Sequence, residues 1–397
     1  MSEGRSGWNV YQLGQLIERG SAELQTGPFG TMLNSSEYTV TGTPVIAVQD
    51  IGENKLSHHK FVYVNEFTVK RLSRYKVKKG DIILGRKGAV ERRAIIKTSE
   101  EGWLQGSDCI RLRFDDSIDA AFISYQFGSE SHREWMLQFA SGATMPSLNQ
   151  QILKLLPIRL PALPEQKVIA AVLSSLDDKI DLLHRQNKTL ESMAETLFRQ
   201  WFIEEAQDYW AARSLSVIAN FLNGLACQKY PPQNGIEKLP VLKIKELSSG
   251  ITELSDWATS KVKPEYVVEF GDVIFAWSAS LMVKIWDGER CVLNQNLFKV
   301  TSEDYPKWFY LLWCKHHLAE FISISSGHAT TMGHIKRGDL DAAMVIVPSE
   351  HELTEMSRIM MPILENQIAN AKQIKSLKKL RDTLLPKLMS GEVRVAV

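Results

Sequence analysis

The residues with the clearest chemical potential are lysines and arginines crowded between positions 70 and 97. Eleven basic residues against only Asp81 and Glu91 leave this stretch with a net charge of +9. Such a density of positive charge attracts a polyanion, although a basic run can also be no more than the solvated face of a domain. The basic residues are Lys70, Arg71, Arg74, Lys76, Lys78, Lys79, Arg86, Lys87, Arg92, Arg93 and Lys97.

A glycine-flanked loop, Gly85–Gly88, lies inside this stretch between two strand-like runs. A loop of this kind can present an arginine to a phosphate or to the edge of a guanine. Small polar side chains of a later loop, SGATMPSLN at 141–149, can also reach base edges. The predicted DNA contacts of the first half are therefore Arg86, Lys87, Arg92, Arg93, Thr144 and Asn149.

The corresponding loop of the second half, AWSASL at 276–281, carries no basic residue. If both loops contact DNA, they read different sequences. Two candidates nearby have ordinary structural alternatives, Asn294 as the cap of a turn and Trp277 as part of the core. The predicted DNA contacts of the second half are Trp277, Ser278, Asn294, Gln295, Asn296, His328 and Thr330.

The sequence offers no catalytic constellation. It has no P-loop, HExxH motif, nucleophile elbow or carboxylate–lysine nuclease cluster. The TGPFGT segment at 26–31 is glycine-rich, but it does not join a clear strand to a helix as a cofactor loop would. Cys314 with His316 and His317 is a possible metal-ligand cluster, and packing inside an aromatic helix is the favoured interpretation. An enzyme with an unrecognised site, a compact methyltransferase or nuclease, remains an alternative class.

The element that must position these loops is a long helix from Leu163 to Phe202. Its apolar residues recur in steps of three and four, a mean period of 3.5 that is typical of a coiled-coil seam. Asn187 falls on the same series, either as a register-setting polar residue or as a solvated break. The series is Ile169, Leu173, Leu176, Ile180, Leu183, Asn187, Leu190, Ala194, Leu197 and Trp201.

The partner of this helix lies in the same chain. Adding 187 to each seam position gives a second, poorer series, and Pro362 and Pro386 are expected to limit its helix at either end. The order of strands, loops and helices before the first helix also recurs before the second, which predicts an internal repeat. The second series is Met356, Met360, Ile363, Gln367, Asn370, Ile374, Leu377, Arg381, Leu384 and Leu388.

Composition sets the remaining bounds. A chain of 397 residues is long enough for two domains, and a formal charge of +1 does not by itself indicate a partner. The four cysteines form no CxxC pair, which favours a reducing cytoplasm. No signal-peptide pattern and no apolar run long enough to span a bilayer is present, so we expect a cytoplasmic protein without membrane contact.

Several segments together resemble one known family, the specificity (S) subunits of type I restriction-modification systems. The resemblance covers essentially the whole chain, and the second half departs from it with MVIVPSEHE in place of a proline-rich helix entry and with its non-basic loop. The matching segments are TGPFGT (26–31), GDIILGRKG (80–88), GWLQGSDCIRLR (102–113), SGATMPSLNQ (141–150), LPIRLPALPEQ (156–166) and LLPKLMSGEV (384–393).

The resemblance implies an α+β fold, with mixed α/β recognition domains. Two pseudo-symmetric globular target recognition domains would be separated by two long antiparallel coiled-coil helices. The predicted segments are a first recognition domain (1–160), a central long helix (161–207), a second recognition domain (208–347) and a C-terminal long helix (348–397).

The implied function is non-catalytic reading of a bipartite, asymmetric site in double-stranded DNA. Two adenine-N6 methyltransferase (M) subunits and up to two motor-nuclease (R) subunits would dock on the chain. S-adenosylmethionine, ATP and magnesium would belong to those partners, with no cofactor or metal bound by this chain. A helix of about 38 residues is nearly 60 Å long, enough to act as a ruler between two reading domains. A coiled-coil adaptor that binds no DNA is the alternative.

Overall fold

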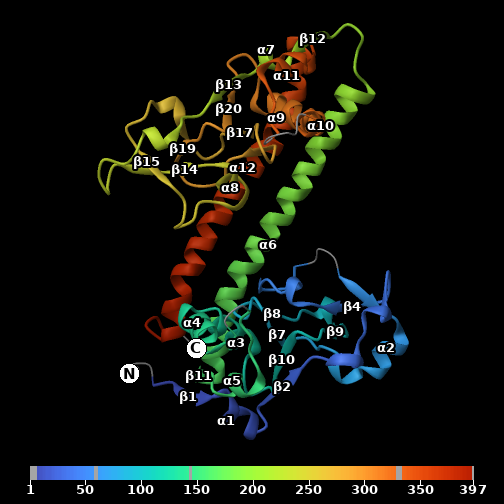
Figure 1. The fold of residues 1–397 in the computed structure, drawn as a ribbon, viewed down its shortest axis with the longest axis vertical. Helices are drawn as coiled ribbons and strands as arrows, with labels where there is room; N and C mark the ends of the chain where they lie inside the picture. The colour runs from blue at the N-terminus through green and yellow to red at the C-terminus, as the bar shows by residue number, and fades with distance from the viewer. Residues whose placement is uncertain (1–6, 58–60, 143–144, 328–332, 396–397) are drawn as a thin grey trace. The chain divides into compact units, whose positions relative to one another are not determined.

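The structure is a computed structural model that describes residues 7–57, 61–142, 145–327 and 333–395. The chain divides into two compact units (Figure 1). Unit 1 comprises Met1–Ile180 and Leu377–Val397, and unit 2 comprises Asp181–Ser376. Each long helix therefore contributes to both units, and the division of the chain into four functional segments stays a prediction.

Unit 1 contains two mixed sheets and a short strand pair at the entry to the first long helix. The first sheet has the order β2 (Ala22–Thr26), β10 (Cys109–Phe114), β7 (Ile82–Gly85), β8 (Arg93–Ile95) and β5 (Glu53–Asn54). The second has the order β3 (Tyr38–Thr39), β6 (Val62–Val64), β4 (Thr43–Ile46) and β9 (Leu104–Gln105). The pair is β1 (Asn9–Gln12) with β11 (Pro157–Leu160), and the helices are α1 (Leu13–Glu18), α2 (Glu66–Arg71), α3 (Ala120–Phe127), α4 (Glu130–Phe139) and α5 (Gln150–Lys154).

Strand β7 shows why the sequence folds in this way. Its run IILG is apolar and buried along its whole length, as expected of a strand covered on both faces. Ile82 and Leu84 pack in a cluster with Phe122 of α3, whereas Ile83 packs in another with Ile46 of β4. Successive side chains point to opposite faces of a strand, so this one strand supplies two cores.

Unit 2 repeats the core of this topology, although its first sheet has four strands where that of unit 1 has five. Strand β14 pairs antiparallel with β15 and in parallel with β19, just as β4 pairs with β6 and β9, so the predicted internal repeat is confirmed. Its first sheet has the order β13 (Asn220–Asn223), β20 (Leu297–Thr301), β17 (Val273–Ala276) and β18 (Met282–Ile285). Its second sheet has the order β15 (Trp257–Thr259), β14 (Lys238–Leu242), β19 (Cys291–Leu293) and β16 (Val267–Val268). The other elements are β12 (Ala211–Ser214) paired with β21 (Met344–Val347), α7 (Leu215–Ile218), α8 (Ile244–Ser249), α9 (Lys307–His316), α10 (Leu318–Gly327) and α11 (Arg337–Ala342).

The long helices are α6 (Leu163–Arg199), which continues into a π-helical turn at Gln200–Glu204, and α12 (Glu350–Ser390). In unit 1 they are joined by ion pairs of Glu165 with Arg394, just past the end of α12, and of Asp177 with Arg381, each at 2.9 Å. Residue numbers rise along one partner and fall along the other, so the helices are antiparallel (Figure 1). Every position of both seam series is buried or half-buried, Asn187 included.

The expectation that two prolines limit the second long helix was wrong. Helix α12 runs straight through Pro362 and Pro386 instead of being limited by them. A proline inside a helix costs about 3 kcal/mol, but burial of a single large apolar side chain contributes about 1.5–3 kcal/mol. Ile363 and Leu364 beside the first proline, and Leu388 and Met389 after the second, are buried and offset that cost.

In unit 1, the helical segment 120–139 is not one helix but is broken into α3 and α4 at Gly128 and Ser129. A side chain at Gly128 would overlap the guanidinium of Arg93, which would then have to move. The Ser129 hydroxyl donates to the carbonyl oxygen of Gln126, which ends the preceding helix. The second half is interrupted in the same way, between α9 and α10 at His317.

Candidate nucleic-acid interface

The predicted basic loop Gly85–Gly88 joins β7 to the segment before β8 and is clamped on two sides. On one side the Arg86 amide donates to the Asp108 carbonyl oxygen at 2.7 Å. On the other, the Leu148 amide donates to the Arg86 carbonyl oxygen at 2.8 Å, and the Gly88 amide donates to Pro146 at 2.9 Å. The loop is thus held by backbone bonds that leave its side chains free to vary.

Glycines allow these segments to come together. Gly88 has φ +76°, a conformation that costs other residues about 1–2 kcal/mol. A Cβ on Gly27 would overlap the carbonyl oxygen of Gly106, so the TGPFGT segment can approach the 106–108 turn only through glycine. Three motifs that are far apart in the sequence therefore meet at one place.

The side chains at this place form a small cluster around Arg86. Its Nη2 donates to Asp108 Oδ1 at 2.8 Å, and its guanidinium carbon lies 4.9 Å from the centre of the Phe29 ring. Lys87 Nζ is 3.8 Å from the same carboxylate oxygen. Phe29 is 51% exposed, so an aromatic face and two cations lie together at the surface. Sequence reasoning missed Phe29 and Asp108, although both lie in the quoted motifs TGPFGT and GWLQGSDCIRLR.

The other predicted contacts of the first half have different environments. Arg92 is exposed. Asn149 is exposed too, but its side chain caps α5 by accepting from the Ile152 amide at 2.9 Å. Arg93 is only 8% exposed, and its Nε donates to the Ser124 carbonyl oxygen, so its burial argues against the predicted DNA contact. Thr144 lies outside the described residues.

The charge of the basic stretch is partly neutralised from outside it. Arg71 is paired with Glu37, Lys70 with Glu66 at 3.0 Å, and Arg86 with Asp108. These carboxylates lie beyond positions 70–97, so the +9 counted along the sequence overstates the local field. The surface charge that remains is carried by other members of the stretch, such as the exposed Lys79 and Arg92.

Unit 2 builds the equivalent loop with the same backbone bonds. The Trp277 amide donates to Asn296 at 3.4 Å, Ile335 donates to Trp277 at 3.1 Å, and Ala279 donates to Gly333 at 2.9 Å. Trp277 therefore corresponds to Arg86, Asn296 to Asp108 and Ala279 to Gly88. Ala279 even keeps the left-handed backbone of Gly88, with φ 58°.

The side chains of this second loop are not basic. Trp277 is half-buried, stacks on Phe298 with ring centres 5.6 Å apart, and donates from Nε1 to Asn223 Oδ1 at 3.3 Å. Asn296 is half-buried and Gln295 is exposed, so both can be reached from solvent.

Two other candidates of the second half are buried. Ser278 is 6% exposed and Asn294 is 3% exposed, which argues against the predicted DNA contacts. Asn294 Oδ1 accepts from the Asn296 amide at 3.3 Å, as the turn-capping alternative requires. His328 and Thr330 lie outside the described residues.

Arg93 is buried beside a polar cluster formed by residues of α3, α6 and α12 in unit 1. Tyr125 Oη donates to Asp177 Oδ2 at 2.7 Å, and Arg381 Nη1 donates to Asp177 Oδ1 at 2.9 Å. Burial lowers the pKa of Arg93 to about 10, and nearby Glu53, Tyr125 and Asp177 oppose that shift.

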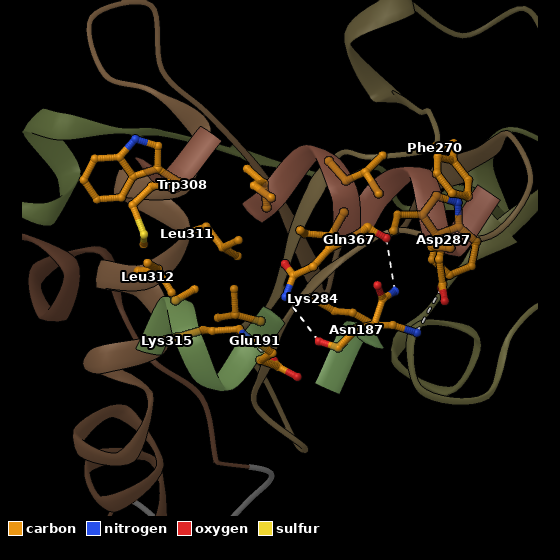
Figure 2. Close-up of a pocket in the computed structure, with 18 residues that line it drawn as sticks. Asn187, Glu191, Phe270, Lys284, Asp287, Trp308, Leu311, Leu312, Lys315 and Gln367 are labelled. Atoms are coloured by element: carbon orange, nitrogen blue, oxygen red, sulfur yellow. Dashed lines mark hydrogen bonds and ion pairs between the residues drawn. The ribbon is translucent and has the colours of Figure 1, made fainter. Parts of the chain in front are cut away.

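Unit 2 has a cavity of about 230 Å³ at the equivalent place (Figure 2). By strand pairing and the 187-residue repeat, the positions of Arg93, Tyr125, Asp177 and Arg381 are taken there by small or apolar residues. These are Val283, Leu312, Leu364 and Ala194. All of them line the cavity, and three of the four are smaller than their unit 1 counterparts, which leaves space at this place.

Polar groups surround this apolar cavity in pairs. Lys284 is paired with Asp287 at 3.0 Å, and Lys315 with Glu191. Figure 2 shows Asn187 and Gln367 bonded to each other across the two long helices.

Other site types find little support. In the part of the chain that the structure describes, no group of three or more His, Cys, Asp or Glu side chains could hold a metal ion. Cys314 is fully buried, and His317 Nε2 lies 2.9 Å from the carbonyl oxygen of Met344, which agrees with the packing interpretation. Among the described helices, none is long and apolar enough to cross a bilayer.

Comparison with known proteins gives a consistent result. The sequence profile described as type I restriction modification DNA specificity domain matches residues 5–192 and 207–379. The chain is 27% identical to the type I restriction enzyme MjaIX specificity subunit of Methanocaldococcus jannaschii, over 90% of this chain and 88% of that protein. It is 21% identical to the EcoKI specificity subunit of Escherichia coli, over 88% and 82%.

A solved structure is similar in fold. The type I restriction-modification S subunit from M. genitalium matches with a TM-score of 0.61 at 14% identity, covering 98% of this chain and 97% of that one.

Proposed function

Because the chain belongs to the family of type I restriction-modification DNA specificity domains, we propose that it is the non-catalytic subunit that selects a DNA site for partner enzymes. Each unit reads one half of a bipartite, asymmetric site in double-stranded DNA. The chain acts in the cytoplasm and itself binds no cofactor. Two adenine-N6 methyltransferase (M) subunits and up to two motor-nuclease (R) subunits dock on it and bring S-adenosylmethionine, ATP and magnesium.

One observation carries this proposal. The two units hold equivalent loops on equivalent backbone hydrogen bonds, yet one presents Arg86 and the other Trp277. Backbone bonds of this kind carry no sequence preference, whereas side chains that reach base edges do. A pair of equivalent supports with unlike side chains suits a target whose two halves differ.

The paired long helices support a role as a spacer. Their seam is largely apolar, the two helices are antiparallel, and the seam's spacing is set by the helix rise of 1.5 Å per residue. Inserting one heptad into each helix adds about 10 Å, at most about three base pairs of DNA rise. The spacer of the methylated motif should lengthen in such a variant. An unchanged spacer would show that the length of the helices does not set it.

The decisive experiment is genome-wide mapping of N6-methyladenine in the host with this gene intact and deleted. We expect one split motif with a fixed unspecified gap to lose its methylation on deletion. If no motif changes, the chain is combined with the neighbouring methyltransferase in vitro. Assembly that is insensitive to salt and gives neither DNA binding nor methylation would favour the coiled-coil adaptor instead.

A further inference from the structure

Arg86 and Asp108 form a fixed donor–acceptor pair on the surface of unit 1. Both are anchored by the bond from the Arg86 amide to the Asp108 carbonyl, and their side chains meet at 2.8 Å. The Arg86 side chain is 20% exposed and that of Asp108 is 46% exposed. The contacts of Asp108 with Arg86 and Lys87 both use Oδ1, so in the described part of the chain Oδ2 is left to accept another donor.

This arrangement complements one base pair in particular. In the major groove, guanine presents the acceptors O6 and N7, and its cytosine partner presents the N4 amino donor beside them. A guanidinium donates to the guanine edge, and a carboxylate accepts from cytosine N4. We propose that Arg86 and Asp108 together select a G·C pair in the half-site contacted by unit 1, an inference that rests on the proposed DNA-reading function.

Phe29 acts as the positioning residue of this pair. Its ring lies 4.9 Å below the guanidinium carbon, and the TGPFGT segment that carries it is fixed by Gln150 Nε2 donating to Thr26 Oγ1 at 2.8 Å. Stacking on an aromatic face keeps the guanidinium plane in one orientation. Less side-chain freedom is then lost when a base edge is bound, which favours a specific contact over a diffuse phosphate contact.

The free chain also leaves the Arg86 guanidinium incompletely satisfied. Its Nε is buried and has no hydrogen-bond partner among the described residues. A buried donor without a partner is unfavourable, so a small rearrangement that pairs it on DNA binding adds to the affinity for the correct site. At the equivalent place unit 2 has Trp277 and Asn296, which supply no cation, so we expect no matching G·C requirement from that loop.

The test uses the full chain assembled with its methyltransferase subunits, and a set of duplexes in which each base pair of the wild-type motif is changed in turn. Arg86→Lys keeps the charge but removes the planar fork, and Asp108→Asn keeps the shape but changes the acceptor. Each should lower the discrimination for one G·C pair about 5- to 150-fold, leaving the other half-site and the spacer unchanged. Phe29→Leu should relax the same position to a smaller extent.

Lys79→Gln is the control for a contact that depends on charge alone, because Lys79 is an exposed cation of the same basic stretch outside this cluster. It should weaken binding equally for all duplexes and reduce the salt dependence. If Arg86→Lys and Asp108→Asn leave every position of the motif unchanged, or weaken all duplexes equally, the pair does not read a base and the inference is overturned.

If Arg86→Lys abolishes all methylation, the test rests on Asp108→Asn, which retains the arginine. A relaxed G·C position in Asp108→Asn then supports the inference, and an intact motif overturns it. Failure of the proposed function looks different, since the wild-type assembly would then methylate no split motif at all.

Discussion

Units 1 and 2 share their loop supports but not their loop side chains. The bonds that hold Arg86 in one unit hold Trp277 in the other, and the left-handed residue after each is kept, as Gly88 or as Ala279. Backbone geometry has therefore been conserved between the halves while charge has not. The comparison separates two roles within one fold: the backbone bonds hold the loop in place, and the loop side chains determine what it contacts.

A similar contrast appears where the long helices pack against the rest of each unit. Unit 1 fills the space with Arg93, Tyr125, Asp177 and Arg381, whereas unit 2 leaves a cavity at the equivalent positions. Charged groups in such a place must be paired with one another, whereas apolar groups need only fill space. We therefore expect unit 1 to respond to loss of one charge, and unit 2 to respond to added volume.

The largest effect should come from breaking the polar cluster with Asp177→Ala. This change removes the partner of Tyr125 and Arg381 and leaves Arg93 buried without a nearby carboxylate on α6. Because the cluster is only partly exposed, we expect unfolding of unit 1 to become easier by about 3 kcal/mol. Asp178→Ala, the exposed neighbour, should change stability by less than about 0.5 kcal/mol. Equal effects in urea unfolding of the two variants would remove the basis of the comparison.

A gain in stability should follow from filling the cavity of unit 2 with Ala194→Leu. The corresponding position of unit 1 carries arginine, so there is room for a long side chain. The added carbons should stabilise by about 1.5 kcal/mol after side-chain entropy is subtracted. Ala369→Leu adds the same atoms on an exposed face of α12 and should give no gain. A lower thermal midpoint for Ala194→Leu would mean that the cavity is not open in solution.

The equivalent loop residues offer a reciprocal pair of substitutions. Gly88→Ala should destabilise by about 1 kcal/mol, because an added Cβ meets nothing within 4 Å and only the positive φ opposes it. Ala279→Gly should stabilise by about 0.5 kcal/mol, since relief of strain is partly offset by chain entropy. Thermal unfolding of both variants would measure this, and shifts of the same sign would show that the two backbones are not equivalent.

The smallest effect is a pH dependence of unit 1 that comes from His132. Burial lowers the pKa of His132, and Arg159 and Arg93 add to the shift, whereas the contact of His132 Nε2 with the Pro157 carbonyl oxygen at 2.8 Å opposes it. The unfolded chain then binds the proton more readily, so this stability is present above the ordinary pKa of about 6.5 and is lost as pH falls below it. His132→Gln should flatten the difference in unfolding midpoint between pH 7.5 and pH 5.5, and an unchanged difference would exclude His132 as its source.

Much of the architecture could be predicted because it rests on periodicity. A seam of period 3.5 and its copy 187 residues later indicate two paired helices, and both series are buried or half-buried throughout. The continuation of α12 through Pro362 could not be foreseen, because it depends on buried neighbours such as Leu364 that outweigh the lost backbone bond.

The candidate site was harder to predict than the fold. Charge counted along the chain does not distinguish Arg92, which faces solvent, from Arg93, which points into the polar cluster. Asp108 escaped attention because its importance comes from lying beside Arg86, 22 residues earlier in the chain. Sequence reveals which residue types are available, and only the folded backbone shows which of them share a place.

The amide network of Asn187 has a consequence for how the chain can change over generations. Asn187 Nδ2 donates to the Gln367 carbonyl oxygen at 3.1 Å, and Asn370 Nδ2 donates to Asn187 Oδ1 at 2.9 Å, within an otherwise largely apolar seam. A slip of one helix along the other would leave these polar groups facing hydrocarbon, which is unfavourable for every intermediate offset. We therefore expect insertions and deletions to be tolerated only as whole repeats that return the amides to one another. The length of such a seam can then change during evolution only in steps of a whole repeat, and not one residue at a time.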